Sequence, residues 1–289
     1  METYFRAKPI AKDTWLIEAE GCTCYLVKGE RESLVIDTGY SGKNIRAFAE
    51  SITGTPVRWV ANTHGHFDHT ADDGWFEKYY MSAGSAEMIG IPYPSLEDRW
   101  FPPIDKNNIE LVTDGSFIDL GGRVLECFDI PAHSTSIAYL DRNARILFSG
   151  DEVAPSVNLR NIAKYAENME KLMAVRGEFD YVCYGHGKEM CFASLVDCCY
   201  ENAMHILAGN LGEKPQMGGP KEHKGPPPIP APTRYETWDK RWDYPRPGDG
   251  PGAKSADGKV KRPPVKGNMY SSCWAEVRLN YDADTIPVM

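Results

Sequence analysis

The chain has 289 residues, of which 42% are hydrophobic and 25% charged, a composition typical of a globular protein with an apolar core. Its formal net charge of −9 argues against a nucleic-acid-binding protein, because neutralising phosphates requires a basic face. No apolar run approaches the roughly 20 residues of a membrane-spanning helix, so we expect neither a nucleic acid nor a membrane as partner.

The first part of the chain alternates strand-like and helix-like segments. Residues 15–17, 24–27 and 34–36 are short β-type runs that glycine and charged residues interrupt. Apolar residues at helical spacing predict a helix over residues 42–52. Residues 57–62 form a further predicted strand, which leads directly into a group of histidines.

Two hairpins and two helices are predicted in the following part. Residues 116–130 and 136–149 each contain two β-type runs joined by a turn, Gly-Gly in the first and Asp-Arg-Asn in the second. Apolar residues at helical spacing predict a helix over residues 161–175. A last strand at 181–184 and a last helix over 189–210 complete this region.

The amino-acid composition changes near residue 212. This change predicts a folded domain over residues 1–212 and a C-terminal extension over 213–289. The Gly- and Pro-rich residues 211–268 exclude a helix or a central strand. They nevertheless carry four aromatic residues at 235–244, and aromatic residues are depleted in disordered tails. We expect this arm to pack on the domain, with a substrate lid and a homodimer arm as alternatives. Residues 273–279 alternate and predict a late edge strand.

The N-terminal sequence lacks the apolar core of a signal peptide, which predicts a cytoplasmic protein. In that compartment we expect the eight cysteines to be reduced thiols. The pairs at 22/24 and 198/199 do not have the C-x-x-C spacing of a zinc site, and we interpret them as core or spare thiols.

The strongest chemical signal is a cluster of three histidines and an aspartate, which are His64, His66, Asp68 and His69. Imidazole nitrogen and carboxylate oxygen are ligands of zinc and similar divalent ions. Residues two apart on an extended segment point the same way, so His64 and His66 can bind one ion and the other pair a second. The chain has only 7 histidines, so a plain polar surface turn is a poor alternative.

Three further candidates follow predicted strands. His133 follows a strand at 123–130, Asp151 follows the run at 147–150, and His186 follows the strand at 181–184. Taken singly, each residue also fits a helix or turn cap. Loops at the carboxyl ends of strands converge in α/β architectures and host functional sites, so the set predicts one common site.

In this order the motifs resemble those of the metallo-β-lactamase superfamily of metallohydrolases. Its His-x-His-x-Asp-His signature corresponds to residues 64–69 and its downstream motifs to His133, Asp151 and His186. The resemblance covers roughly residues 10–210 and makes the first domain the catalytic one. It implies an α/β (α+β) fold, a four-layer αββα sandwich with two mixed sheets between outer helices, and a two-metal site at one edge.

The resemblance also implies a role for each residue. His64, His66 and His133 would hold one divalent ion and Asp68, His69 and His186 the other, with Asp151 bridging the ions and Asp37 orienting a ligand imidazole. Zinc suits these ligands best, and iron and manganese are alternatives because nitrogen and oxygen ligands are not selective. Asp68 or Asp151 would pass a proton to the leaving group.

The resemblance is to the glyoxalase II and lactonase-like branch rather than to true β-lactamases. The commonest zinc β-lactamases carry cysteine where this chain has Asp151, and they are secreted. The expected function is therefore hydrolysis of a small ester, thioester or lactone by a metal-bridging hydroxide, with a small molecule as the expected partner. A mononuclear-iron sulfur dioxygenase and a phosphodiesterase are the alternatives on the same scaffold.

Overall fold

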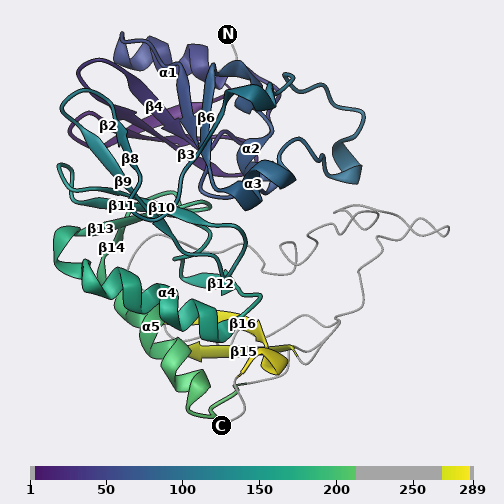
Figure 1. Ribbon diagram of the computed structural model, residues 1–289, viewed down its shortest axis with the longest axis vertical. Coiled ribbons are helices and arrows are strands. Elements are labelled where there is room, and N and C mark those ends of the chain that lie inside the picture. The colour runs from purple at the N-terminus through teal and green to yellow at the C-terminus, as the bar shows by residue number, and fades with distance from the viewer. Residues whose placement is uncertain (1–3, 213–268, 287–289) are drawn as a thin grey trace.

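The computed structural model describes residues 4–212 and 269–286, and it confirms the expected four-layer sandwich (Figure 1). Two mixed sheets pack face to face between helices, with α1 above the first sheet and α4 and α5 below the second. The described helices are α1 (Ile45–Thr53), α2 (Phe67–Thr70), α3 (Ala83–Met88), α4 (Ile162–Ala174) and α5 (Ser194–Leu207).

The first sheet has seven strands in chain order. Its first four strands form an antiparallel meander, and the last three add in parallel. The strands are β1 (Arg6–Ala11), β2 (Thr14–Glu18), β3 (Thr23–Lys28), β4 (Ser33–Ile36), β5 (Trp59–Ala61), β6 (Lys78–Met81) and β7 (Ile109–Leu111).

The second sheet has six strands in the order β14-β13-β11-β10-β9-β8. It contains both predicted hairpins as one antiparallel meander, to which β13 adds in parallel. The strands are β8 (Phe117–Asp119), β9 (Val124–Asp129), β10 (Ile137–Asp141), β11 (Ile146–Gly150), β13 (Tyr181–Tyr184) and β14 (Cys191–Phe192).

Three apolar cores separate the four layers, because successive side chains of a strand point to opposite faces. In β3, Tyr25 and Val27 lie in the core between the sheets, whereas Cys24 and Leu26 lie in the core under α1. In β10, Tyr139 faces the other sheet, and its neighbours Ala138 and Leu140 face α4 and α5. The strands are therefore apolar on both faces, as expected for sheets covered on both sides.

The two predicted helices before residue 180 are confirmed with small shifts at their ends. Helix α1 begins at Ile45 because the Asn44 side chain accepts a hydrogen bond from Ala47 N, and it ends at Gly54 with a φ of 65°. Helix α4 begins after Asn161, whose side chain accepts from Lys164 N. Cap chemistry, rather than apolar spacing, therefore sets where these helices begin.

The prediction of a single edge strand at 273–279 is wrong. The segment is a β-hairpin of β15 (Met269–Trp274) and β16 (Val277–Asp282), with positive φ values of 48° and 65° at Ala275 and Glu276. The turn contains no glycine or asparagine, so the alternating pattern gives no indication that the chain reverses there. Strand β16 lies in the middle of a third sheet, between β15 and β12 (Ser156–Asn158). The predicted arm at 213–268 lies outside the described residues.

The two large sheets are joined at one end by a buried ion pair. The Arg123 guanidinium, which precedes β9, donates to Asp141 Oδ2 at the end of β10 at 2.7 Å. It also donates to Asp13 O at 2.7 Å and to Thr14 Oγ1 at 2.6 Å, at the start of β2. A charge with this many partners can be buried without a large penalty, and it connects the second sheet to the first.

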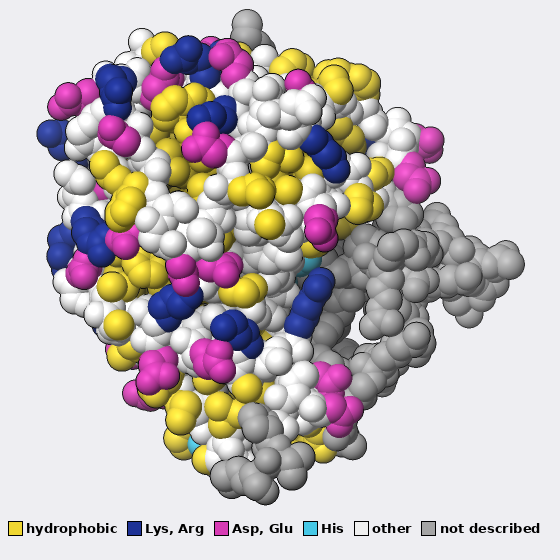
Figure 2. Space-filling model, in the orientation of Figure 1, with side chains coloured by type: hydrophobic (Ala, Val, Ile, Leu, Met, Phe, Trp, Pro, Cys, Tyr) yellow, Lys and Arg dark blue, Asp and Glu magenta, His cyan; other side chains and the backbone are white. Residues whose placement is uncertain are grey.

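The surface view in Figure 2 shows positive and negative side chains interspersed over the described part of this face. Within residues 4–212 and 269–286, no helix combines the length and apolar character that crossing a membrane requires.

Candidate metal centre

The predicted ligands come together at one edge of the sandwich, where several strands end. The segment after β5 supplies His64 and His66, and helix α2 supplies Asp68 and His69. The other three follow β9, β11 and β13, and they are His133, Asp151 and His186. The structure therefore places all seven sequence-predicted residues in one cluster, which is buried except for a partly exposed His186.

Three histidines form a first ligand group. One nitrogen from each of His64, His66 and His133 lies within 4.8 Å of the other two. The His64 Nε2 and His66 Nδ1 atoms are 2.8 Å apart, and the planes of the two rings are nearly perpendicular. Three imidazole nitrogens converging on one point are a typical protein contribution to a zinc site.

A second group consists of Asp68, His69 and His186, again with ligand atoms within 4.8 Å of one another. Asp68 Oδ2 lies 3.7 Å from His69 Nε2 and 3.6 Å from His186 Nε2. Asp68 and His69 are adjacent in the one-turn helix α2, and His186 enters from the loop after β13.

Asp151 lies between the two groups. Its Oδ2 atom is 3.0 Å from His186 Nε2 and 3.8 Å from His69 Nε2 in the second group, and 3.9 Å from His133 Nε2 in the first. His64, His69 and Asp151 also form a ligand group of their own. This is the position that a carboxylate shared by two ions would occupy.

Asp37 holds the histidine segment in place through hydrogen bonds. Its carboxylate accepts hydrogen bonds from His69 Nδ1 at 2.8 Å, from Thr63 N at 2.8 Å and from Thr63 Oγ1 at 2.7 Å. The residue is buried, and its backbone has a φ of 58°, which non-glycine residues adopt rarely. The bond to His69 places the proton on Nδ1 and leaves Nε2 facing the cluster.

The other imidazoles are oriented in the same way. The Thr63 hydroxyl donates to Asp37, so it accepts from His64 Nδ1, which lies 3.1 Å away. His133 Nδ1 donates to the carbonyl oxygen of Asn158 at 2.7 Å. In both histidines the Nε2 lone pair therefore faces the cluster, ready for a cation.

Burial and charge set the ionisation of the site. Burial lowers the pKa values of His64, His66 and His133, so these rings are neutral at physiological pH. Burial acts in the same direction on His69, but the carboxylates around it raise its pKa to about 10. Burial opposes ionisation of Asp151, yet the charges of His186 and His69 hold its pKa well below the usual range. Asp151 is therefore ionised within the cluster.

These residues fit a pair of divalent cations. The Nε2 atom of His69 is fully buried and has no hydrogen-bond partner among the described residues, although it faces the carboxylates. Gly185 leaves the necessary room, because a Cβ atom there would lie 2.4 Å from Asp151 Oδ1 and 2.6 Å from His69 Cε1. A buried imidazole nitrogen facing two carboxylates, with neutral imidazoles beside it, is the donor set expected for zinc.

Two residues at the site were missed by the sequence analysis. The Tyr93 hydroxyl, from the loop after α3, donates to Asp68 Oδ1 at 2.6 Å. Glu152 is fully buried behind the cluster and accepts from the backbone nitrogen of His133 at 2.9 Å. Each is a single residue outside a repeating pattern, so only the fold reveals its position.

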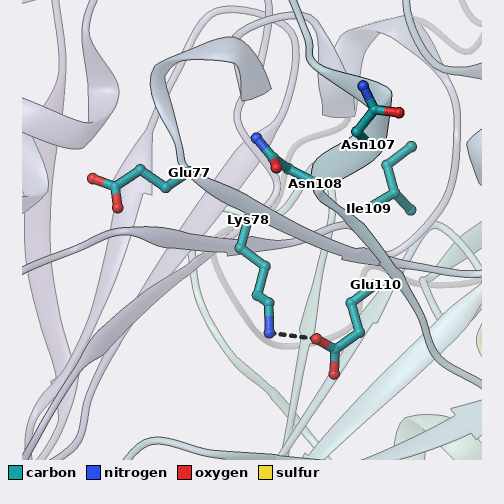
Figure 3. A pocket seen from close by; sticks show the side chains of 6 residues that line it. All are labelled: Glu77, Lys78, Asn107, Asn108, Ile109 and Glu110. Carbon is teal, nitrogen blue, oxygen red and sulfur yellow. Dashed lines mark ion pairs between the residues drawn. The ribbon is translucent and has the colours of Figure 1, made fainter.

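A separate surface cavity of about 270 Å³ lies at the start of β6 and β7, away from the ligand cluster. Figure 3 shows Lys78 and Glu110 paired across it. Its other lining residues are Glu77, Asn107, Asn108 and Ile109.

The comparison with protein families identifies the class. The family model described as the metallo-beta-lactamase superfamily matches residues 17–186. This is more than half of the chain, and the chain belongs to this superfamily.

Individual proteins are more distantly similar. The acyl-coenzyme A thioesterase MBLAC2 of Bos taurus is 28% identical over 200 residues, covering 56% of this chain and 71% of the relative. An atrochrysone carboxyl ACP thioesterase of Aspergillus terreus is 26% identical over 141 residues, covering 46% of this chain and 39% of the relative.

Among solved structures, a beta-lactamase domain protein from Burkholderia ambifaria superposes with a TM-score of 0.56 at 18% identity. The match covers 72% of this chain and 79% of the other, and it shows the shared fold alone. Family membership and the ligand cluster together make this protein a metal-dependent hydrolase, and its curated relatives are thioesterases rather than β-lactamases.

Proposed function

We propose that the protein hydrolyses acyl thioesters at a dinuclear zinc centre. The observation that carries the proposal is the position of Asp151, whose Oδ2 lies within 3.0–3.9 Å of histidine nitrogens from both ligand groups. A carboxylate in this position could be shared by ions held in the two groups. The thioesterase relatives support a thioester, rather than an ester or a lactone, as the substrate.

In this proposal His64, His66 and His133 hold one ion and Asp68, His69 and His186 the other, with Asp151 between them. When bound, two zinc ions supply a water whose pKa is near 7 and a Lewis acid for the substrate carbonyl. The chain's contribution is to fix ligand geometry. Asp37, Thr63 and the Asn158 carbonyl hold three of the imidazoles with Nε2 toward the ions.

The ionisation of the site suits a substrate with a good leaving group. The neutral rings of His64 and His133 already donate their Nδ1 protons to Thr63 and Asn158, and the ionised Asp151 has no proton to give to a leaving group. An ion bound at His69 would replace the proton on its Nε2 atom. The Tyr93 phenol donates a hydrogen bond to Asp68 Oδ1. A thiol has a pKa near 8.5, so a thiolate leaves without prior protonation, whereas an alkoxide leaving group needs an acid.

The test is to load purified protein with zinc, count the bound ions, and measure thiol release from acyl-coenzyme A substrates. An oxygen-ester analogue, a lactone and a phosphodiester are assayed in parallel. We expect two zinc ions per chain and a preference for the thioester. Asp151→Asn should lower the rate at least 100-fold, in line with removal of a major electrostatic contribution at an active site. Asp284→Asn, an exposed aspartate on a short turn after β16, is the matched control.

Two outcomes would contradict the proposal. A single iron with oxygen uptake would indicate the sulfur dioxygenase alternative. Turnover of the phosphodiester in preference to the thioester would indicate a phosphodiesterase.

A further inference from the structure

The C-terminal hairpin of β15 and β16 lies about 90 residues beyond the segment that the family model matches, which ends at residue 186. In Figure 1 it lies next to α5 and beside β12, which follows the metal segment that contains Asp151. The hairpin is held there by Asn202 of α5, whose side chain donates to Val277 O at 2.8 Å and accepts from Ser272 Oγ at 2.8 Å.

Strand β16 supports the whole length of β12. The two strands are parallel, with Val157 opposite Leu279 and Asn158 opposite Asn280. Outside the ladder, Arg278 N donates to Pro155 O at 2.9 Å and Leu159 N donates to Asn280 O at 2.7 Å.

The Asn280 side chain adds a contact of its own. It is 1% exposed, and its amide donates to Val157 O at 3.3 Å. Within the described residues, β12 pairs with β16 and with no other strand. The position of β12 therefore depends on β16.

The other side of this segment contacts the metal loop. The Asn158 carbonyl accepts from His133 Nδ1 at 2.7 Å, and Arg160 N donates to Ala132 O at 2.8 Å. The carbonyl that fixes the tautomer and direction of the His133 ring is therefore in the residue paired with Asn280. Apolar packing is continuous as well, since Leu279, Val157 and Ala132 belong to one buried core.

We propose that strand β16 is part of the support of the metal centre, with Asn280 as a positioning residue for the ligand His133. The inference rests on the proposed metal site and goes beyond it, because it assigns a role to a segment outside the family domain. The hairpin acts through β12, and it acts on one ligand group only, since β12 contacts His133 and the second group is held by α2 and the loop after β13.

The test is the substitution Asn280→Ala, which removes the amide donor to Val157 O. We expect zinc to bind about tenfold more weakly at the site that contains His133 and with unchanged affinity at the other, as for other groups that orient a metal ligand. Competition with a chromogenic chelator measures both affinities, and the absorption spectrum of the cobalt-substituted protein reports the geometry of each site. Ile118→Val, a buried substitution in β8, is the control for general destabilisation and should leave both affinities unchanged.

Unchanged affinities in folded Asn280→Ala protein would overturn the inference, and so would an equal loss at both sites. If the wild-type chain binds two zinc ions and hydrolyses thioesters while Asn280→Ala behaves like it, only this inference fails. If the wild-type chain binds no zinc, the proposed function fails as well.

A second measurement needs no variant, in case Asn280→Ala does not fold. Coupling between two sites is reciprocal, so zinc binding should stabilise the β12–β16 ladder. We expect zinc to slow hydrogen exchange of the Leu159 and Arg278 amides more than that of Glu30 N, which donates to Gly121 O at the far end of the sandwich. Equal effects on all three amides would overturn the inference.

Discussion

At the scale of single residues, Asp37 holds the histidine segment in place. Its carboxylate accepts three hydrogen bonds, one from the His69 ring and two from Thr63. Asp37→Asn keeps the size of the side chain but replaces an oxygen by an amide donor facing another donor. We expect a 10- to 100-fold loss of zinc affinity at the site containing His69, measured by chelator competition. An affinity equal to wild type would show that the ring is held by packing alone.

Tyr93 contacts the cluster through its hydroxyl group. Its donation to Asp68 Oδ1 at 2.6 Å orients that carboxylate. Tyr93→Phe keeps the ring contacts with Phe67 and removes only the hydroxyl. We expect kcat to fall about tenfold with little change in zinc content, as for loss of one positioned donor. Steady-state kinetics on a thioester checks this, and a loss confined to KM would instead indicate a role in substrate binding.

The cluster could be predicted from the sequence because histidine and aspartate side chains are themselves metal-binding groups. Histidines and aspartates at strand ends are rare enough to stand out, and the structure brings the seven together. Their role as ligands stays a prediction. Residues that act through a hydroxyl or a backbone carbonyl, such as Thr63, Tyr93 and Asn158, carry no such mark, and their contacts depend on the tertiary fold.

At the scale of elements, a buried carboxylate joins the loop before α1 to the end of α2. Asp72 accepts from Ser41 Oγ at 2.7 Å and from Gly42 N at 2.9 Å. Burial raises its pKa to about 6 despite these hydrogen bonds. The folded state therefore holds the proton more tightly than the unfolded chain does, and ionisation destabilises the fold as the pH rises from about 4 through 6.

Asp72→Asn removes this titration and keeps an oxygen acceptor. Relative to wild type, we expect the variant to gain about 2 kcal/mol of unfolding free energy between about pH 4.5 and about pH 7.5. Urea unfolding of both proteins in the presence of a chelator measures the difference. A pH-independent difference would mean that Asp72 titrates in the fold as it does in the unfolded chain.

The elements themselves were predictable where a local pattern is complete. Helix α4 shows apolar spacing and an asparagine cap, and the two central hairpins show alternation and turn residues. The C-terminal hairpin was not predicted because its turn, Ala275–Glu276, has no turn-forming residue. Strand β12 has three residues and exists only because β16 pairs with it, so it has no local signal.

At the scale of the whole molecule, the proposed ions would stabilise the fold, because their ligands come from both sheets. Each site saturated at 100 times its dissociation constant contributes about 2.7 kcal/mol. We expect chelation to lower the melting temperature by about 5–10 °C, and added zinc to restore it. Calorimetry with and without a chelator measures the shift. An unchanged melting temperature in protein shown to lose its zinc would contradict the arrangement.

Contacts join the two large sheets at both ends of the sandwich. Arg123 joins them where β9 begins, and the ligand cluster joins them beyond the point where β9 ends. A sandwich joined in this way does not open between its layers. Under the proposed function, we therefore expect the acyl group to reach the cluster over the loops that carry Tyr93 and Arg160. These loops, rather than the core, should then decide which acyl chains are accepted.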